Sequence, residues 1–218
     1  MNSPLIQLLV LAGIAVFLIL RLKSVLGTRE GFEKPPVPKP GPKPSRPDFE
    51  VIEGGPDRDI TDYVPEGGES AEALAAMKRI EPSFSVSDFV QGSRQAYEMI
   101  VMGFERGDLD AIQPLLSEEV FDTFVEVVAA REDQGLTIEA EFAGVRETSL
   151  QLAEFDPETG RAEITMRFVG ELTSVVRDNG GDVIEGSLSE VKRQKDAWTF
   201  ARDMGTDDPN WQLVATDA

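Results

Sequence analysis

The sequence predicts an α+β protein: an N-terminal transmembrane helix, then helices packed on a curved antiparallel sheet. Three observations lead to this prediction. An apolar run near the start of the chain ends at two cations, apolar residues then recur at helical spacing as far as Gly135, and beyond Gly135 they recur at every second position. Helices followed by short alternating strands are typical of a domain in which one face of a sheet packs on the helices.

The expected transmembrane anchor occupies residues 1–23. Its apolar part runs from Leu5 to Leu20, and a helix over about residues 2–20 would span roughly 28 Å, close to the thickness of the hydrocarbon core of a bilayer. Arg21 and Lys23 follow the run and no Lys or Arg precedes it, whereas an export signal has the reverse order and ends in small residues. A cleaved signal and a short helix buried in a soluble core are therefore the less favoured alternatives.

The same cations predict the orientation of the anchor. Arg21, Lys23 and Arg29 all lie on the C-terminal side of the apolar run. Positively charged residues flanking a membrane helix are enriched on the cytoplasmic side. We therefore expect the N-terminus to lie outside and the rest of the chain to be cytoplasmic.

A flexible linker is expected over residues 24–69. Residues 35–47 read PPVPKPGPKPSRP, and seven prolines in thirteen residues favour the extended polyproline II conformation. A spacer between the bilayer and the domain is the favoured interpretation, and a ligand for a proline-recognising module is the alternative. Residues 50–70 are acidic and rich in Gly, and we expect them to stay loose.

The domain proper, residues 70–218, is expected to open with two helices. A short helix should begin at about residue 69 and end before Pro82. A longer helix should follow, because Ser85 is a good N-cap residue and has Asp88 three positions on, while Gly107 suits a C-terminal cap. Apolar residues at helical spacing fill the interval between these two caps.

Two more helices are expected before the strands. Asp108 should cap a short helix, and Ser117 should open a longer one that Gly135 ends. The capping box at Ser117 is incomplete, because the residue three positions on is Val120. The apolar face of this helix is expected to carry Val120, Phe121, Phe124, Val127 and Val128.

Alternation of apolar and polar residues predicts strands after Gly135. The side chains expected on the apolar faces are Ile138, Ala140, Phe142, Leu150, Leu152, Ile164, Met166, Phe168, Leu172, Trp198, Phe200, Trp211 and Leu213. Turn signals at residues 156–160, 178–182 and 205–210 separate the strands. An antiparallel meander with one face on the helices is therefore expected.

Most residue types on which catalytic sites depend are missing. The chain has no Cys and no His, and it contains no G-x-S-x-G sequence or Gly-rich phosphate loop. The candidate acid–base carboxylates are Glu139, Glu141, Glu163 and Glu171, and the alternation turns all four toward solvent. We therefore expect no enzymatic activity and no cofactor. We also expect no metal site, because helix capping explains the acidic stretch at 108–110.

Charge is distributed unevenly along the chain. Residues 1–47 carry a net charge of +5, and the remainder carries −24. Nucleic acid would repel so acidic a domain, so no nucleic-acid function is expected. Lys192, Arg193 and Lys195 form a candidate basic patch for lipid headgroups or an acidic partner, although a solvated strand start is the favoured interpretation.

Four aromatic residues are the candidate contacts of a pocket or a partner: Phe168, Trp198, Phe200 and Trp211. A place in the core is the favoured interpretation for the last three, because large aromatic side chains on the apolar face of a strand are usually buried. Trp198 and Trp211 have the largest apolar area to bury if a partner does reach them.

Three stretches of the sequence together resemble the Tim44 family. They are residues 20–33 (LRLKSVLGTREGFE), 96–124 and 168–216, and the terminal pattern W-T-F…D-P-N-W-x-L is the most specific part. The resemblance covers roughly residues 70–217 and the anchor edge. It implies a cone of the nuclear-transport-factor-two-like kind, with an apolar pocket between sheet and helices. The chain lacks the long charged N-terminal region of the family's eukaryotic members, and its domain is strongly acidic.

The resemblance also implies a function. Members of this family are non-enzymatic, membrane-associated proteins that link a chaperone or a protein-translocation machine to a membrane, and the bacterial members carry an N-terminal anchor. We therefore expect a single-pass adaptor or scaffold at the cytoplasmic face of a bacterial inner membrane. It would contact the bilayer through its helix and hold a protein partner: a chaperone, a translocation factor or an assembly factor. The alternative is a lipid- or small-molecule-binding module that uses the pocket.

Overall fold

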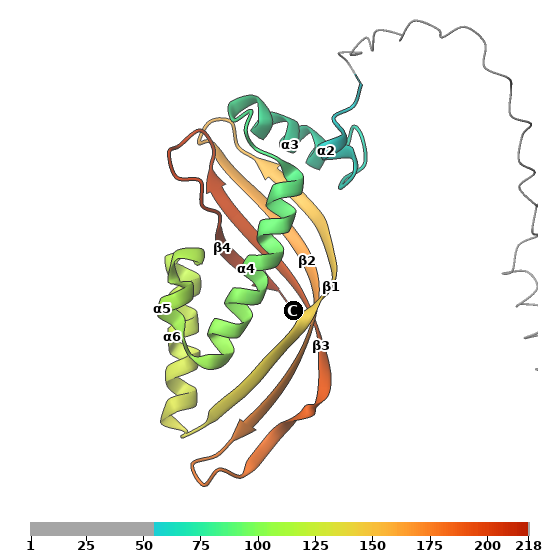
Figure 1. The fold of residues 1–218 in the computed structure, drawn as a ribbon. Helices are drawn as coiled ribbons and strands as arrows, with labels where there is room; N and C mark the ends of the chain where they lie inside the picture. Colours follow the sequence, from blue (N-terminus) through green and yellow to red (C-terminus); the bar gives the residue numbers. More distant parts are fainter. Residues whose placement is uncertain (1–54, 218) are drawn as a thin grey trace, which may run out of the picture. The chain divides into compact units, whose positions relative to one another are not determined.

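The structure, a computed structural model, describes residues 55–217 (Figure 1). The elements in chain order are α2 (Arg58–Thr61), α3 (Glu69–Ile80), α4 (Val86–Arg106), α5 (Leu109–Ile112), the 3-10 turn η1 (Gln113–Leu115), α6 (Glu118–Asp133), β1 (Thr137–Phe155), β2 (Arg161–Arg177), β3 (Val183–Asp203) and β4 (Gln212–Asp217). The anchor residues Leu5, Leu20, Arg21 and Lys23 and the proline-rich segment lie outside the described residues. No helix within residues 55–217 is long and apolar enough to cross a membrane.

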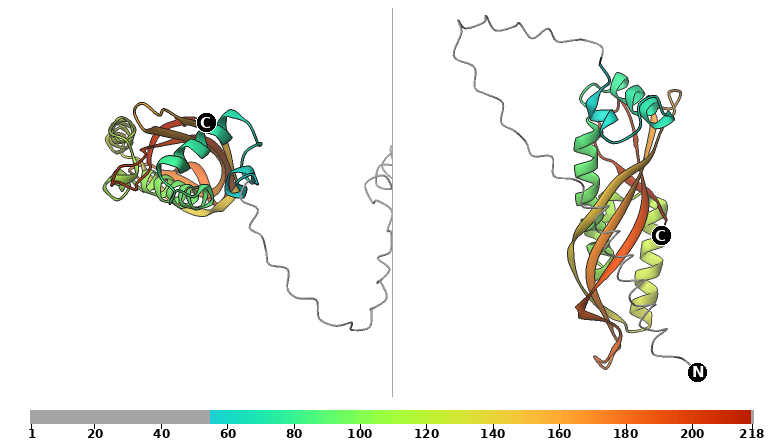
Figure 2. Two further views of the ribbon diagram at one scale, coloured as in Figure 1. Left: turned by 90° about the horizontal axis from the view of Figure 1, so that it is seen from above. Right: turned by 90° about the vertical axis from the view of Figure 1, so that its right-hand side faces the viewer.

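The strands form one antiparallel sheet in the order β1-β2-β3-β4, which confirms the predicted meander. Its connections coincide with the three predicted turn signals. Figures 1 and 2 show the sheet curving around α4, which runs along its concave side. The prediction of an α+β domain with helices packed on a curved sheet is therefore confirmed for the described residues.

β1 joins both alternating stretches of the sequence into one strand, but bulges interrupt it. Three register shifts occur where β1 pairs with β2, and the last lies between Leu150 and Leu152. Leu150 and Ala153 are buried, whereas Leu152, which the alternation places on the apolar face, is 40% exposed. The prediction for Leu152 is wrong because a bulge inserts an unpaired residue and so reverses which side chains face the core.

Most of the predicted helix caps are confirmed. The Ser85 Oγ accepts a hydrogen bond from the Asp88 amide at 3.2 Å, and Gly107 ends α4 in the left-handed conformation with φ of 73°. The Ser117 Oγ accepts from the Val120 amide in the same way. Asp108 stands before α5 but makes no side-chain capping bond, so capping does not explain it. Its backbone is not in the extended conformation that a capping side chain requires.

The apolar face of α6 is only partly covered. Val120 and Val128 are buried, Phe121 and Phe124 are half-buried, and Val127 is 39% exposed. The prediction that Val127 packs inward is wrong. The reason is that α6 contacts mainly the short strand β4 and the short helix α5 rather than the long strands β1, β2 and β3.

The core lies between α4 and the sheet. Tyr97 and Ile100 of α4 meet Phe168 of β2 and Phe200 of β3, and each of the four is at most 2% exposed. Gly170 of β2 makes room for the Tyr97 ring, because a Cβ at this position would lie 2.7 Å from the Tyr97 Oη. The close approach of α4 to β2 therefore depends on a residue without a side chain.

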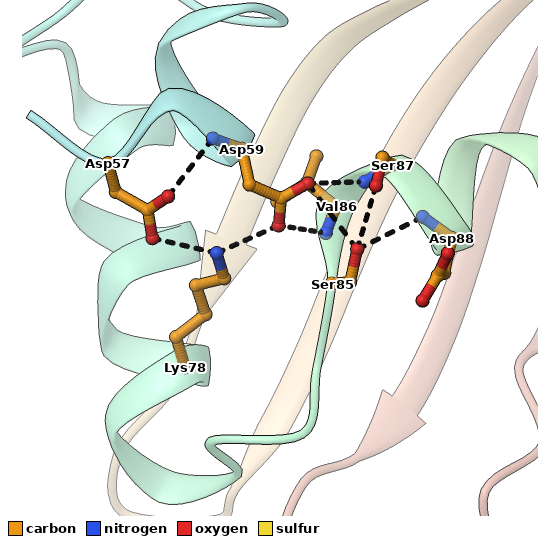
Figure 3. Close-up of polar contacts among 7 residues, drawn as sticks. All are labelled: Asp57, Asp59, Lys78, Ser85, Val86, Ser87 and Asp88. Atoms are coloured by element: carbon orange, nitrogen blue, oxygen red, sulfur yellow. Dashed lines mark hydrogen bonds and ion pairs between the residues drawn. The ribbon is translucent and has the colours of Figure 1, made fainter.

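The folded unit begins before the predicted domain boundary at residue 70. Residues 57–64, which the linker prediction of 24–69 includes, carry helix α2 and bury Ile60 and Val64. Asp59 accepts hydrogen bonds from the amides of Val86 and Ser87, both at 2.8 Å, at the start of α4 (Figure 3). The expectation that residues 50–70 stay loose is therefore wrong for this stretch, because two apolar side chains and one carboxylate fasten it to the domain.

Lys78 of α3 completes this attachment. Its Nζ lies 2.7 Å from an oxygen of Asp57 and 2.8 Å from an oxygen of Asp59, so one cation joins both carboxylates (Figure 3). Burial favours a higher pKa for the Asp59 carboxyl, but the hydrogen bonds from Lys78, Ser87 and Val86 outweigh it and hold the pKa far below its usual range. We call Asp57, Asp59, Lys78, Val86 and Ser87 the N-terminal clasp.

Candidate functional site

An open pocket of about 330 Å³ lies beside the first turns of α4. Four aromatic side chains line it: Phe84 from the loop before α4, Phe89 from α4, Phe200 from β3 and Trp211 from the β3–β4 loop. The Trp211 and Phe89 rings meet edge to face with centroids 4.7 Å apart, and Phe84 lies 5.9 Å from Trp211. We call this the aromatic pocket.

The chain holds Trp211 in place through its neighbours. Leu213, two residues on, is fully buried, and its carbonyl accepts a hydrogen bond from the Ser117 amide at 2.9 Å. On the other side, the Asp208 carbonyl accepts from the Arg202 Nε at 2.9 Å. Trp211 itself stays half-buried, so the structure presents a fixed indole whose remaining surface can still be covered.

An ion pair forms part of the rim of the aromatic pocket. Arg202 is only 8% exposed, and its guanidinium donates to the Glu81 carboxylate at 2.6 Å. Burial alone would raise the pKa of Glu81, but the hydrogen bond and the charge of Arg202 lower it overall. The pocket therefore combines aromatic walls with a charge pair of fixed geometry.

A second cavity of about 280 Å³ lies between α4, α6 and the sheet, with Trp198 in its wall. Asp196, which is 7% exposed, also lines it and accepts hydrogen bonds from the Tyr97 Oη and, at 3.0 Å, from the Gln194 Nε2. Burial, together with the hydrogen bond to Asp196 and its negative charge, raises the pKa of Tyr97, so the phenol remains a donor.

Asp196 was not among the predicted site residues, although the sequence carries a signal for it. It lies two and four residues before Trp198 and Phe200, and the alternation therefore places it on the same inward face. A carboxylate at such a position requires hydrogen-bond donors inside the fold. Tyr97, 99 residues earlier in the chain, is one of them.

The four predicted aromatic residues do not form one site. Phe168, Trp198 and Phe200 are at most 5% exposed and belong to the core. Phe200 and Trp211 share the aromatic pocket, Trp198 lines the second cavity, and Phe168 lines neither of the two. Phe84 and Phe89 complete the aromatic pocket, and the site prediction did not include them because both read as ordinary apolar positions near a helix start.

The predicted basic patch lies in the middle of β3, because this strand begins at Val183 rather than near residue 191. Two of its three cations have carboxylate partners. Lys192 lies 3.6 Å from Glu185, and Arg193 lies 2.9 Å from Glu171. The hydrogen bond from Arg193, with the charge of Arg146, lowers the pKa of Glu171. The patch is solvated as expected, but it is not the start of a strand.

The candidate acid–base carboxylates are turned away from the core, as the alternation predicts. Glu139 and Glu141 are exposed, and Glu163 and Glu171 are half-buried. Glu139 pairs with Arg177 at 3.0 Å, and Glu163 pairs with Arg161 at 3.3 Å. Within residues 55–217, no three or more acidic, His or Cys side chains come together in a way that would hold a metal ion.

Comparison with known proteins identifies the family. The model of the Tim44-like domain matches residues 70–218. The chain belongs to the Tim44-like domain family. The resemblance seen in the sequence is thereby confirmed, and both the aromatic pocket and the Tyr97–Asp196 pair lie within the matched residues, whereas the α2 half of the clasp lies before them.

This Tim44-like protein is similar to two mitochondrial import subunits. It is 24% identical over 171 residues to the human mitochondrial import inner membrane translocase subunit TIM44, an alignment that covers 74% of this chain and 37% of the human protein. It is 20% identical over 151 residues to subunit TIM44-1 of Arabidopsis thaliana, covering 66% of this chain and 31% of that protein. The chain thus spans about a third of the length of these relatives.

One of the solved structures that align with this chain is from a chloroplast protein. The crystal structure of the intermembrane space region of the chloroplast protein ARC6 aligns with a TM-score of 0.36 and 11% sequence identity. The alignment covers 66% of this chain and 94% of the ARC6 chain.

Proposed function

We propose that this protein is a non-enzymatic, membrane-anchored adaptor that binds a protein partner in its aromatic pocket. The observation that carries the proposal is the half-buried Trp211, which packs against Phe84 and Phe89 in the wall of an open pocket. The family supports it, because both named relatives are subunits of a protein-import translocase. The predicted anchor would hold the domain at the cytoplasmic face of a bacterial inner membrane.

Physical chemistry favours this pocket as the docking point. A few desolvated aromatic or Arg anchors supply most of the binding energy in protein interfaces. The pocket offers Trp211 as an aromatic anchor whose partners are already in place, so little conformational entropy is lost when it is covered. The Glu81–Arg202 pair on the rim can orient polar groups of the partner.

The charge of the domain limits the alternatives. The part of the chain after residue 47 carries a net charge of −24, which repels nucleic acid and anionic headgroups and steers basic partners toward the domain. Single exposed ion pairs contribute only about 0–1 kcal/mol each, so apolar contacts must provide the specific affinity.

A lipid or another small apolar molecule is the second candidate occupant of the same pocket. Its volume of about 330 Å³ falls at the lower end of the range of ligand pockets, and four aromatic side chains line it. The two candidates differ in what remains bound after purification. A protein adaptor retains a polypeptide, whereas a lipid-binding module retains lipid alone.

The test is co-purification of the full-length protein from detergent-solubilised membranes, with protein and lipid both identified by mass spectrometry. Trp211→Ala should lower recovery of the protein partner at least about tenfold, as expected for a central aromatic anchor. Met99→Ala is the matched control, because Met99 is an apolar side chain of α4 that is 52% exposed and does not line this pocket. Undiminished recovery with a normally folded Trp211→Ala protein would remove the pocket from the proposal, and lipid without stoichiometric protein would favour the second candidate.

A further inference from the structure

Exposed apolar side chains gather on the first half of β3. Nine large apolar residues within the described part of the chain are strongly exposed, and four of them lie between residues 183 and 191. Val183 and Ile184 are 51% and 56% exposed, and Leu188 and Val191 are 49% and 54% exposed. This concentration on one strand is more than the scattered surface hydrophobic residues that any soluble domain shows.

The same half of β3 is an open sheet edge. β4 pairs only with residues 197–201 of β3, so within residues 55–217 no strand pairs with the outer edge of residues 183–196. An edge of this length presents unpaired backbone donors and acceptors, which can pair with another strand.

A four-residue bulge divides this edge into two short stretches. On the β2 side, Ser187 pairs with Ser174 and Lys192 with Leu172, so residues 188–191 all lie opposite the single residue Thr173. Leu188 and Val191 protrude from the bulge. Residues 183–187 and 192–196 flank the bulge. The first stretch contains a further register shift, because Glu185 pairs with Val176 and Val183 with Arg177, and a strand that pairs with this edge must fit both stretches.

Charge is arranged along the edge in a self-complementary way. Glu185 lies in its first stretch and Glu190 in the bulge, and Lys192, Arg193 and Lys195 follow. Within one chain Lys192 lies 3.6 Å from Glu185 and Arg193 lies 2.9 Å from Glu171, and these exposed pairs can exchange partners. The cations are unusual, because the chain after residue 47 has a net charge of −24. In an antiparallel pairing of two such edges, Glu185 of one copy lies beside the cations at 192–195 of the other, and opposite charges across a strand pair are stabilising.

We propose that the exposed edge of β3 binds the same edge of a second copy of this chain, around a two-fold axis that passes through the bulge. Residues 183–187 of each copy lie beside residues 192–196 of the other, and Leu188 and Val191 of both copies meet near the axis. Such an interface is isologous, so one strand supplies both complementary halves. It joins the two sheets into one, it leaves the aromatic pocket uncovered, and it does not depend on the proposed adaptor function.

The absence of Cys from the sequence allows a direct test in the full-length protein. Ser189, an exposed residue of the bulge, lies beside the proposed axis, and Ser149 is an exposed serine of β1 far from it in the sheet. Under mild oxidation in membranes, Ser189→Cys should form a disulfide-linked dimer with at least about tenfold higher yield than Ser149→Cys, because only the former holds two thiols together. Equal yields for the two variants would overturn the proposal, because chance collision in the membrane would then explain the dimers.

Charge reversal provides the second arm of the test. In the Ser189→Cys background, Glu185→Lys/Glu190→Lys leaves only cations among the exposed charged residues of the edge, and Lys192→Glu/Arg193→Glu/Lys195→Glu leaves only carboxylates. Each variant alone should lose most of the dimer, about tenfold, because both symmetric charge clusters become repulsive. Two differently tagged proteins, one of each kind, should recover a mixed dimer when expressed together. Full dimer yield from either variant alone, or a disulfide to a different protein in place of the dimer, would contradict the second copy as the occupant.

Discussion

Asp59 is the residue that connects three parts of the domain, although it lies in a stretch predicted to be linker. Its carboxylate lies 2.8 Å from the Lys78 Nζ of α3 and accepts from two amides at the start of α4. These amides belong to the first turn of α4, where amides have no partner within the helix. Asp59 therefore acts as a capping residue supplied from 27 positions earlier in the chain, a role that local sequence patterns do not reveal.

The first prediction concerns Asp59 and pH. Asp59→Asn should lower the free energy of unfolding by about 1–2 kcal/mol at pH 7, because it removes a charged cap and an ion pair. Because the folded-state pKa is depressed, the contribution of the carboxylate is present above its unfolded pKa of about 3.9 and is lost as the pH falls further. Urea titrations should therefore show a constant difference from the unsubstituted protein above about pH 5 and a shrinking one below about pH 4.

Asp62→Asn is the control for this prediction. Asp62 is an exposed carboxylate three residues from Asp59, at the end of α2. Its substitution should change stability by no more than about 0.5 kcal/mol. A loss as large as that of Asp59→Asn, or a pH-independent loss at Asp59, would show that net charge rather than the clasp is responsible.

The second prediction concerns the buried pair of Tyr97 and Asp196. Tyr97→Phe keeps the ring, which stacks on Phe168 with centroids 4.5 Å apart, but removes the hydroxyl that donates to Asp196. A buried carboxylate without this donor should cost about 1–3 kcal/mol of unfolding free energy, measured by urea denaturation. The double variant Tyr97→Phe/Asp196→Asn should be more stable than the sum of the two single losses implies, and strict additivity would show that the two side chains are not coupled.

At the scale of elements, the sequence predicts the order and type of the main helices and strands but not the irregularities. Caps such as Ser85 and Gly107 are local signals and are confirmed. The bulge that exposes Leu152 and the four-residue bulge opposite Thr173 depend on how β1 and β3 pair with β2, and no single strand encodes this pairing. The clasp and the Tyr97–Asp196 pair likewise join residues that are far apart in the sequence, so only the folded structure brings them together.

The third prediction concerns α2 as an element. A fragment of residues 52–218 should be more stable than a fragment of residues 69–218, by about 2–5 kcal/mol. The reason is that the shorter fragment exposes the site of Ile60 and Val64, 5% and 6% exposed in the structure, and leaves the start of α4 without Asp59. Thermal and urea denaturation of the two fragments measure the difference.

The double variant Ile60→Ala/Asp59→Asn in the longer fragment separates the two contributions. It should reproduce most of the loss without changing the length of the chain. If the two fragments are equally stable, α2 contributes nothing to the fold, and residues 57–64 belong to the linker after all.

At the scale of the whole molecule, charge separates the chain into a basic start and an acidic remainder. Residues 1–47 carry +5, and the rest carries −24. The basic start suits the anionic headgroups beside the predicted anchor, whereas the acidic domain is repelled by them. We therefore expect the domain to work away from the bilayer surface, with the proline-rich segment of residues 35–47 as the spacer and with its aromatic pocket and β3 edge open to other proteins.

The last prediction concerns the orientation of the predicted anchor. A reporter that is active only in the cytoplasm, fused after Ala218, should be active, because Arg21, Lys23 and Arg29 all follow the apolar run. Three Lys residues inserted before Pro4, combined with Arg21→Gln, Lys23→Gln and Arg29→Gln, should weaken or invert this orientation and move the signal to a reporter that requires the periplasm. The inserted lysines without the three substitutions are the control, and they should give a mixed result because both ends then carry cations. Activity of the periplasm-dependent reporter in the unsubstituted protein would place the aromatic pocket on the other side of the membrane, and the adaptor would then have to find its partner there.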